Sequence, residues 1–238
     1  MTHALLRGDH HVHSTFSDDA VSTLAENVAA ASAAGLETLR LVDHVRRETT
    51  WVPEYLSAVR DLHVPERLTV LTGVEAKILD ASGELDIPAL PAGIDRILIA
   101  DHQFPGGEGP LSPSAVRERI AAGWGSEDAL DQLVSALIAA MRRHPGNQLA
   151  HCFSILPKIG LAEDDLGAER VTAWARAAAE TDTMVEVNEK WGCPGIPLLD
   201  ALRDAGAEIV ACTDSHVATD VGRYARVAEL LREREEQR

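Results

Sequence analysis

The chain has few cysteines and no long apolar runs. It holds 3 cysteines in 238 residues, at positions 152, 193 and 212. Such a sparse, odd set excludes a fold built on disulfides and predicts reduced thiols. No apolar run approaches the roughly 18 residues that cross a bilayer, and the first residues lack the apolar segment of a signal peptide. We therefore expect a cytoplasmic protein without a membrane partner.

Basic residues are also scarce. The chain has 22 lysines and arginines against 38 acidic residues, which gives a net charge of −16. This balance disfavours long nucleic acids and anionic membranes as partners, because binding them requires an excess of basic side chains. A small phosphorylated substrate remains compatible with it, since bound cations can reverse the field inside one pocket.

The composition is that of a globular protein, with 45% hydrophobic and 25% charged residues. Short apolar runs alternate with longer helical stretches along the whole chain. Seven of the runs predict strands, at 4–13, 38–44, 68–78, 96–102, 148–153, 184–188 and 208–213. Helices are expected at 21–34, 53–62, 114–122, 127–144, 162–181, 198–205 and 220–234, with Gly/Pro-rich loops at 104–113 and 191–197.

Strands that alternate with helices predict a parallel sheet built from βαβ units. Seven such units without a linker favour an α/β fold with one domain over residues 1–238. We expect a closed or nearly closed (β/α)7 barrel, and an open doubly wound sheet is the alternative.

Histidines and carboxylates gather at the C-terminal ends of the predicted strands. They are His11, His13, Asp18, His44, Glu75, His102, His151, Asp214 and His216. In an α/β barrel these strand ends converge on one face, which carries the active site. Imidazole and carboxylate are ligands for Zn, Fe or Mn. Nine ligands exceed the needs of one ion, so the sequence predicts two or three divalent ions that share a bridging carboxylate.

Two of the clusters follow the period of a strand. His11 and His13 stand at i and i+2, so both rings point to one side while Val12 packs on the other. Asp214 and His216 repeat this spacing at the far end of the chain. Each pair alone is weak evidence for a metal site, and the recurrence at both ends makes the prediction specific.

The segment D-H-H-V-H-S-T-F-S-D at 9–18 resembles the opening motif of the PHP (polymerase and histidinol phosphatase) family. Segments 42–44, 73–75, 101–102, 150–151 and 213–216 resemble later motifs of the family in the same order. The resemblance covers essentially the whole chain and implies a distorted (β/α)7 barrel with a trinuclear site. By analogy the three ions are held by His11, His13, Glu75 and Asp214, by Glu75, His102 and His151, and by Asp18, His44 and His216.

The resemblance implies a metal-dependent phosphoesterase that hydrolyses a small phosphomonoester, as a histidinol phosphatase does. The expected mechanism is in-line attack by a metal-bound hydroxide, since coordination lowers the pKa of water to about 7. Glu75, Asp214 and His216 are the expected catalytic residues. Arg46, Arg47 and Lys77 follow two of the ligands closely and are the expected substrate-binding residues.

Other functions remain open at this point. A phosphodiesterase or nucleotidase could act on nucleotides or nucleic acid ends. An amidohydrolase also begins with H-x-H on a barrel, although that superfamily commonly has eight strands and a bridging modified lysine. A metal-binding module without catalysis is the last alternative. The sequence specifies neither the substrate, the metal, nor the oligomeric state.

Overall fold

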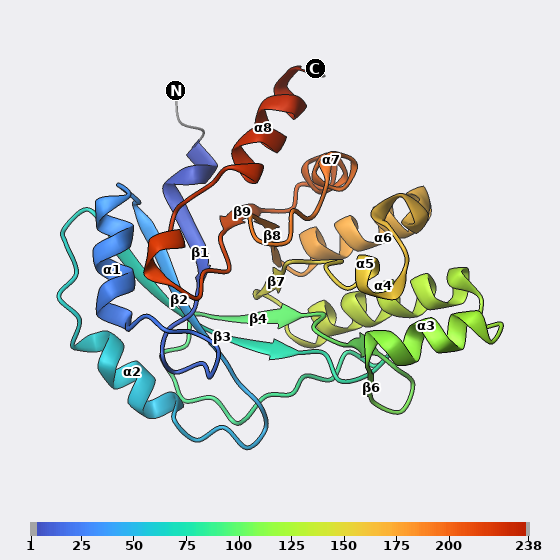
Figure 1. Ribbon diagram of the computed structural model, residues 1–238, viewed down its shortest axis with the longest axis horizontal. Coiled ribbons are helices and arrows are strands. Elements are labelled where there is room, and N and C mark those ends of the chain that lie inside the picture. Colours follow the sequence, from blue (N-terminus) through green and yellow to red (C-terminus); the bar gives the residue numbers. More distant parts are fainter. Residues whose placement is uncertain (1–3, 237–238) are drawn as a thin grey trace.

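The computed structural model of the protein describes residues 4–236 and contains one sheet of seven parallel strands (Figure 1). The strands are β1 (Gly8–Val12), β2 (Thr38–His44), β3 (Thr69–Lys77), β4 (Arg96–Ala100), β7 (Gln148–Ala150), β8 (Met184–Asn188) and β9 (Ile209–Cys212). They lie in the sheet in the order in which they occur in the chain. The predicted seven-stranded parallel sheet is therefore confirmed.

The two edges of this sheet approach each other. Val12, the last residue of β1, forms a parallel bridge with Ser215, which lies just beyond β9, and the backbone N–H of His13 donates to the carbonyl of Ser215 at 2.8 Å. This contact makes the sheet a nearly closed barrel, as predicted, and not the open doubly wound alternative.

Helices follow the strands and surround the barrel (Figure 1). They are α1 (Leu24–Ala33), α2 (Val52–Arg60), α3 (Pro113–Ala121), α4 (Ser126–Arg143), α5 (Leu156–Ile159), α6 (Gly167–Glu180), α7 (Ile196–Ala205) and α8 (Arg226–Glu236). Local sequence explains their starts, because α1 follows a capping box of Thr23 and Glu26 and α3 follows the N-cap Ser112. No helix among residues 4–236 has the length and apolar character of a membrane span.

The hydrophobic core lies mainly between the strands and this outer layer of helices. Apolar faces of α4, α6 and α7 pack in one cluster, and α1 and α2 pack with β2 in another. A separate small cluster of Val42, Leu98, Ala100 and Ala150 joins β2, β4 and β7. Val42 pairs with Gly73, and His44 pairs with Glu75. Because Val42 and His44 are two residues apart on β2, their side chains lie on the same face of the strand. This face is therefore apolar at Val42 and polar at the C-terminal end of β2.

Several boundaries differ from the predictions. Residues 4–7 form the 3-10 helix η1 (Ala4–Arg7), so β1 starts only at Gly8. The predicted loop 104–113 contains a short antiparallel ladder of β5 (Phe104–Pro105) and β6 (Pro110–Leu111).

The C-terminal half differs as well. The predicted strand 148–153 ends at Ala150 because His151 adopts a φ of 28°, and the short helix α5 follows it unpredicted. The predicted helix 162–181 divides into the 3-10 helix η2 (Glu163–Leu166) and α6. The last predicted helix begins only at Arg226, after the 3-10 helix η3 (Ala218–Asp220).

Candidate metal centre

A cavity of about 380 Å³ opens at the C-terminal ends of the strands. The predicted ligands that line it are Asp18, His44, Glu75, His102, Asp214 and His216. His11, His13 and His151 lie beneath them, with side chains that are at most 1% exposed. The fold thus gathers all nine predicted ligands, from positions 11 to 216, in one place.

Glu75 is the hub of the cluster and is fully buried on β3. Its Oε1 lies 3.0 Å from Nε2 of His151 and 3.1 Å from Nε2 of His102. Its Oε2 lies 2.9 Å from Nδ1 of His44. It also faces Nε2 of His11 at 3.4 Å and Nε2 of His13 at 3.5 Å. The two oxygens therefore face different groups of imidazoles, which is the arrangement a bridging carboxylate requires.

The electrostatics of Glu75 favour cations beside it. Burial by itself would raise the pKa of this carboxyl, but the imidazoles of His102 and His11 hold it well below its ordinary value. For His151 the directions are reversed. Burial by itself would lower the pKa of this imidazole, but Asp101 and Glu75 raise it to about 10. A field that holds a proton so strongly on a buried imidazole also favours a bound metal cation.

Asp214 forms the opposite wall of the cluster. Its backbone is in the left-handed region, with a φ of 53°. Its Oδ1 lies 3.3 Å from Nε2 of His13, and its Oδ2 accepts a hydrogen bond of 2.7 Å from the indole N–H of Trp191. Lys190 places its Nζ 3.4 Å from the same oxygen. Burial would raise the pKa of this carboxyl, but hydrogen bonding to His13 and the charge of His11 lower it below its usual range.

The donor set fits bound metal. Nε2 of His11 lies only 2.9 Å from Nε2 of His13. Nδ1 of His11 lies 2.8 Å from Glu186 Oε1, and a carboxylate accepts, so Nδ1 carries a proton and Nε2 is the nitrogen that faces the cluster. Burial lowers the pKa of His13 to about 3, which keeps that ring neutral. Two imidazoles that direct nitrogens at one point, one of them held from behind by a carboxylate, are typical of a metal site.

Three groups of side chains among the described residues place their ligand atoms within 4.8 Å of one another. These groups are His11, His13 and Asp214; His44, Glu75 and His102; and His13, His44 and His216. They overlap, because His13 and His44 each belong to two of them. The grouping is compatible with several ions close together.

The acidic residue beside the outermost histidines is Asp19. Its two carboxylate oxygens lie 3.5 Å from Nε2 of His44 and 3.2 Å from Nε2 of His216. The predicted ligand Asp18 is exposed and lines the same cavity, but it makes no ion pair within the part of the chain that the structure describes. Nothing in the sequence distinguishes these adjacent aspartates, and the path of the loop after β1 places the carboxylate of the second one against the histidines.

Glu186 on β8 is a site residue that the sequence analysis missed. It is fully buried and accepts hydrogen bonds from Gln148 Nε2 at 2.8 Å, from the His151 backbone N–H at 3.0 Å and from Asn188 Nδ2 at 3.0 Å. These bonds fix the carboxylate that holds His11. The signal for Glu186 in the sequence was a charged residue between two valines in the middle of a strand.

Two more buried carboxylates support the histidines from behind. Asp43 accepts a hydrogen bond of 2.7 Å from Ser17 Oγ, and Ser17 Oγ lies 3.2 Å from Nδ1 of His13. Asp101 lies 3.6 Å from Nδ1 of His151. Together with Glu186 they orient the rings, as outer carboxylates commonly do at metal sites.

Basic side chains line the mouth of the cavity. Arg46, Lys77 and Lys190 belong to its lining. Lys77 shares the face of Glu75 at i+2, and its Nζ lies 3.2 Å from Gln103 Oε1. The predicted substrate-binding residue Arg47 does not line this cavity, because its guanidinium lies 3.3 Å from Glu84 on the outer surface.

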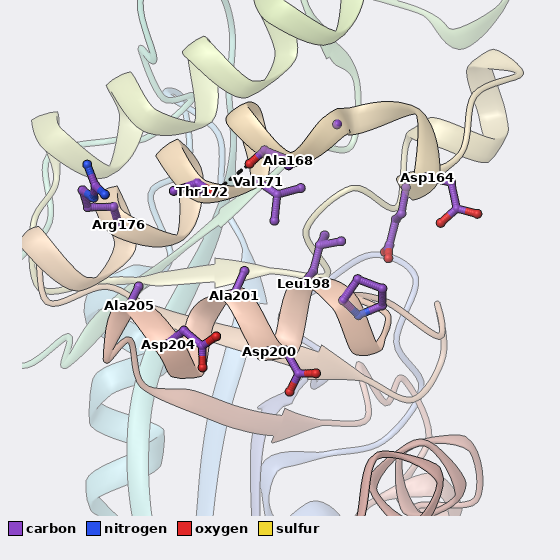
Figure 2. A pocket seen from close by; sticks show the side chains of 13 residues that line it. Asp164, Ala168, Val171, Thr172, Arg176, Leu198, Asp200, Ala201, Asp204 and Ala205 are labelled. Carbon is purple, nitrogen blue, oxygen red and sulfur yellow. Dashed lines mark hydrogen bonds between the residues drawn. The ribbon is translucent and has the colours of Figure 1, made fainter. Parts of the chain in front are cut away.

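A larger hollow of about 800 Å³ lies away from this centre, between α6 and α7 (Figure 2). Its floor includes Val171, Leu198 and Ala201, and its rim carries Asp164 and Asp204. None of the described residues that line it is a histidine. It therefore lacks the donors of the metal centre, despite its size.

Comparisons with known proteins agree with this geometry. The model of the PHP domain family matches residues 9–190. A protein of Acetivibrio thermocellus described as a probable phosphatase is 29% identical over 94% of this chain and 86% of its own length. One of Shewanella sediminis with the same description is 26% identical over 95% and 85%.

Among solved structures, the fold is similar to that of histidinol phosphate phosphatase from Lactococcus lactis, crystallised with zinc, L-histidinol and phosphate. The TM-score is 0.66 at 17% identity, and the match covers 97% of this chain and 92% of that one. This likeness establishes the fold.

Proposed function

Because the chain belongs to the PHP domain family, we propose that it is a phosphatase that hydrolyses a small phosphomonoester with two or three divalent ions, Zn, Mn or Fe. The observation that carries this proposal is the arrangement around Glu75, whose two oxygens face separate groups of imidazoles. The relatives described as probable phosphatases support it. The structural neighbour, crystallised with zinc and phosphate, is a precedent for such chemistry on this fold.

The nine histidines and carboxylates predicted from the sequence would hold the ions, with Asp19 beside Asp18 at the outer position. When bound, the ions would activate a water molecule and neutralise charge on the phosphoryl group. Glu75, Asp214 and His216 remain the proposed catalytic residues, because their side chains border the space in which the phosphoryl group would lie.

The chain itself would orient the substrate. Arg46, Lys77 and Lys190 present cations at the mouth of the cavity, where a phosphate dianion enters. Lys190 is held beside Asp214 and lies 3.3 Å from Nδ1 of His216. Trp191 covers one side, since its indole donates to Asp214 and its ring lies 5.7 Å from that of His151. These side chains restrict water and fix the direction from which the ester approaches.

Metal content and hydrolysis of aryl phosphates test the proposal together. We expect two to three bound ions per chain and turnover of an aryl phosphate monoester that chelation abolishes. Turnover of the diester alone would replace the phosphatase by the phosphodiesterase alternative. Failure to bind metal after reconstitution with Zn, Mn or Fe would overturn the proposal altogether.

A further inference from the structure

A second cavity adjoins the metal centre. It has a volume of about 640 Å³ and shares Lys190, Asp214 and His216 with the cavity that holds the ligands. Its outer wall is the segment 220–226, between η3 and α8. Because both cavities include the same three side chains, they lie next to each other around Lys190, Asp214 and His216.

Most charged groups of this second cavity are already engaged. The carboxylate of Glu189 accepts backbone hydrogen bonds of 2.9 Å from Arg226 and from Val227. The guanidinium of Arg226 donates to the carbonyl of Lys190 at 3.3 Å. The carboxylate of Asp220 lies 3.3 Å from the hydroxyl of Thr219.

The side chain of Arg223 is not engaged in this way. Its backbone N–H donates to the carbonyl of Asp220 at 3.0 Å, but its guanidinium has no hydrogen-bond or ion-pair partner among residues 4–236. The exposed side chain belongs to the lining of the second cavity. Its cation is therefore available to a ligand that enters this cavity.

We propose that the second cavity receives the leaving group of the phosphoester and that Arg223 binds a second anionic group, a phosphate or a carboxylate, on that leaving group. The inference rests on the proposed function and specifies its substrate class. A guanidinium forms paired hydrogen bonds with either anion. Lys190, which lines both cavities, stands between the two anionic groups of such a substrate. The rest of the acidic surface would repel the same molecule, so Arg223 confers selectivity.

The test compares substrates of equal length. Hexyl phosphate, hexanediol bisphosphate and phosphorylated hydroxyhexanoate share one chain and differ only at the far end, and a propyl series varies the reach. We expect kcat/KM to be about tenfold higher for at least one substrate with a second anionic group than for the matched alkyl phosphate, as for one charged hydrogen-bonding contact. Comparison of the bisphosphate with the phosphorylated hydroxyhexanoate shows whether the site prefers a phosphate or a carboxylate as the second anionic group.

Variants of Arg223 test whether this residue causes the preference for a second anionic group. Arg223→Ala should bring the ratio of kcat/KM values close to one, Arg223→Lys should keep part of it, and the exposed control Arg60→Ala should leave it as in the wild type. A wild-type ratio near one in every series, or a ratio that survives Arg223→Ala, would overturn the inference.

A binding measurement separates this inference from the proposed function. Calorimetry of the metal-loaded protein compares hexane bisphosphonate with hexylphosphonate, neither of which is hydrolysed. Tighter binding of the bisphosphonate that disappears in Arg223→Ala supports the anion site even where no phosphoester turns over. Equal binding of the two phosphonates by a protein that hydrolyses aryl phosphates would leave the phosphatase intact and refute the role of Arg223.

Discussion

Glu186 holds His11 across the barrel, with Oε1 of the carboxylate 2.8 Å from Nδ1 of the ring. Both side chains are completely buried. Burial would lower the pKa of His11, but the charges of Glu186 and Glu75 raise it well above its ordinary value. The contact fixes which nitrogen of His11 carries a proton and which one faces Glu75. Glu186 is therefore a positioning residue for the metal centre.

Replacement of this carboxylate by an amide tests that role. We expect Glu186→Gln to weaken metal binding by about tenfold to a hundredfold, the usual effect of losing an outer carboxylate. Competition with a chelator at fixed free metal measures the change without reference to activity. Glu180→Gln, on the exposed end of α6, is the matched control. An unchanged affinity in a folded Glu186→Gln protein would contradict the assignment.

The adjacent aspartates give a paired comparison. Asp19 lies against His44 and His216, whereas Asp18 reaches neither within ion-pair distance. We therefore expect Asp19→Asn to lower the number of ions per chain, and Asp18→Asn to lower it less, in elemental analysis after equilibration with equal free metal. A greater loss in Asp18→Asn would show that the loop rearranges when metal binds and would restore Asp18 as the ligand.

Glu75 should be the most sensitive position of the centre. Glu75→Gln removes the charge that faces two groups of imidazoles at once. Activity should fall by more than about a hundredfold, beyond the effect of an outer residue, and bound metal should fall with it. Circular dichroism shows whether the variant is folded, and its metal content shows whether the loss of activity follows from loss of metal. Near-normal turnover by a metal-loaded Glu75→Gln protein would refute the bridging role.

Arg46 and Arg47 are adjacent in the chain, but we expect their replacement to affect KM differently. Arg46 lines the cavity, while the Arg47 side chain is 56% exposed and pairs with Glu84. For an aryl phosphate, Arg46→Ala should raise KM by about tenfold, as expected for one charged hydrogen bond, and Arg47→Ala should leave KM nearly unchanged. Steady-state kinetics decide between them, and equal effects would contradict the assignment of the phosphate contact to Arg46.

The buried Asp9 on β1 predicts a pH dependence of stability. Burial raises its pKa from 3.8 to about 6, although Thr213 and Gly222 donate hydrogen bonds to it. Between these two values the folded protein keeps a proton that the unfolded chain releases, so this residue makes stability fall as pH rises through that window.

Asp9→Asn removes this titration while it shifts the whole stability curve by a constant amount. Urea unfolding in metal-free buffer should therefore show that the wild type loses stability relative to Asp9→Asn between pH about 4 and about 6, and that the difference is level above about pH 7. Parallel curves for the two proteins would contradict the raised pKa.

The sequence by itself determined the architecture and the positions of the candidate ligands. Strand period and βαβ alternation are local signals, so the seven strands, the nearly closed barrel and the strand-end positions of His44 and Glu75 could be predicted. The i, i+2 spacing of His11 and His13 directed both rings to one side for the same reason. The ends of elements were less predictable, since η1 before β1 and the turn at His151 depend on contacts with distant segments.

Only the tertiary structure decided which side chains support the ligands. Glu186 meets His11 across 175 positions of the chain, and no local pattern encodes a contact of that separation. The same holds for Asp19, which the path of its loop brings to His44 and His216, and for Arg47, which Glu84 holds outside the cavity. Side-chain direction along a strand follows from its period, whereas the partner of a side chain across the barrel depends on packing of the whole chain.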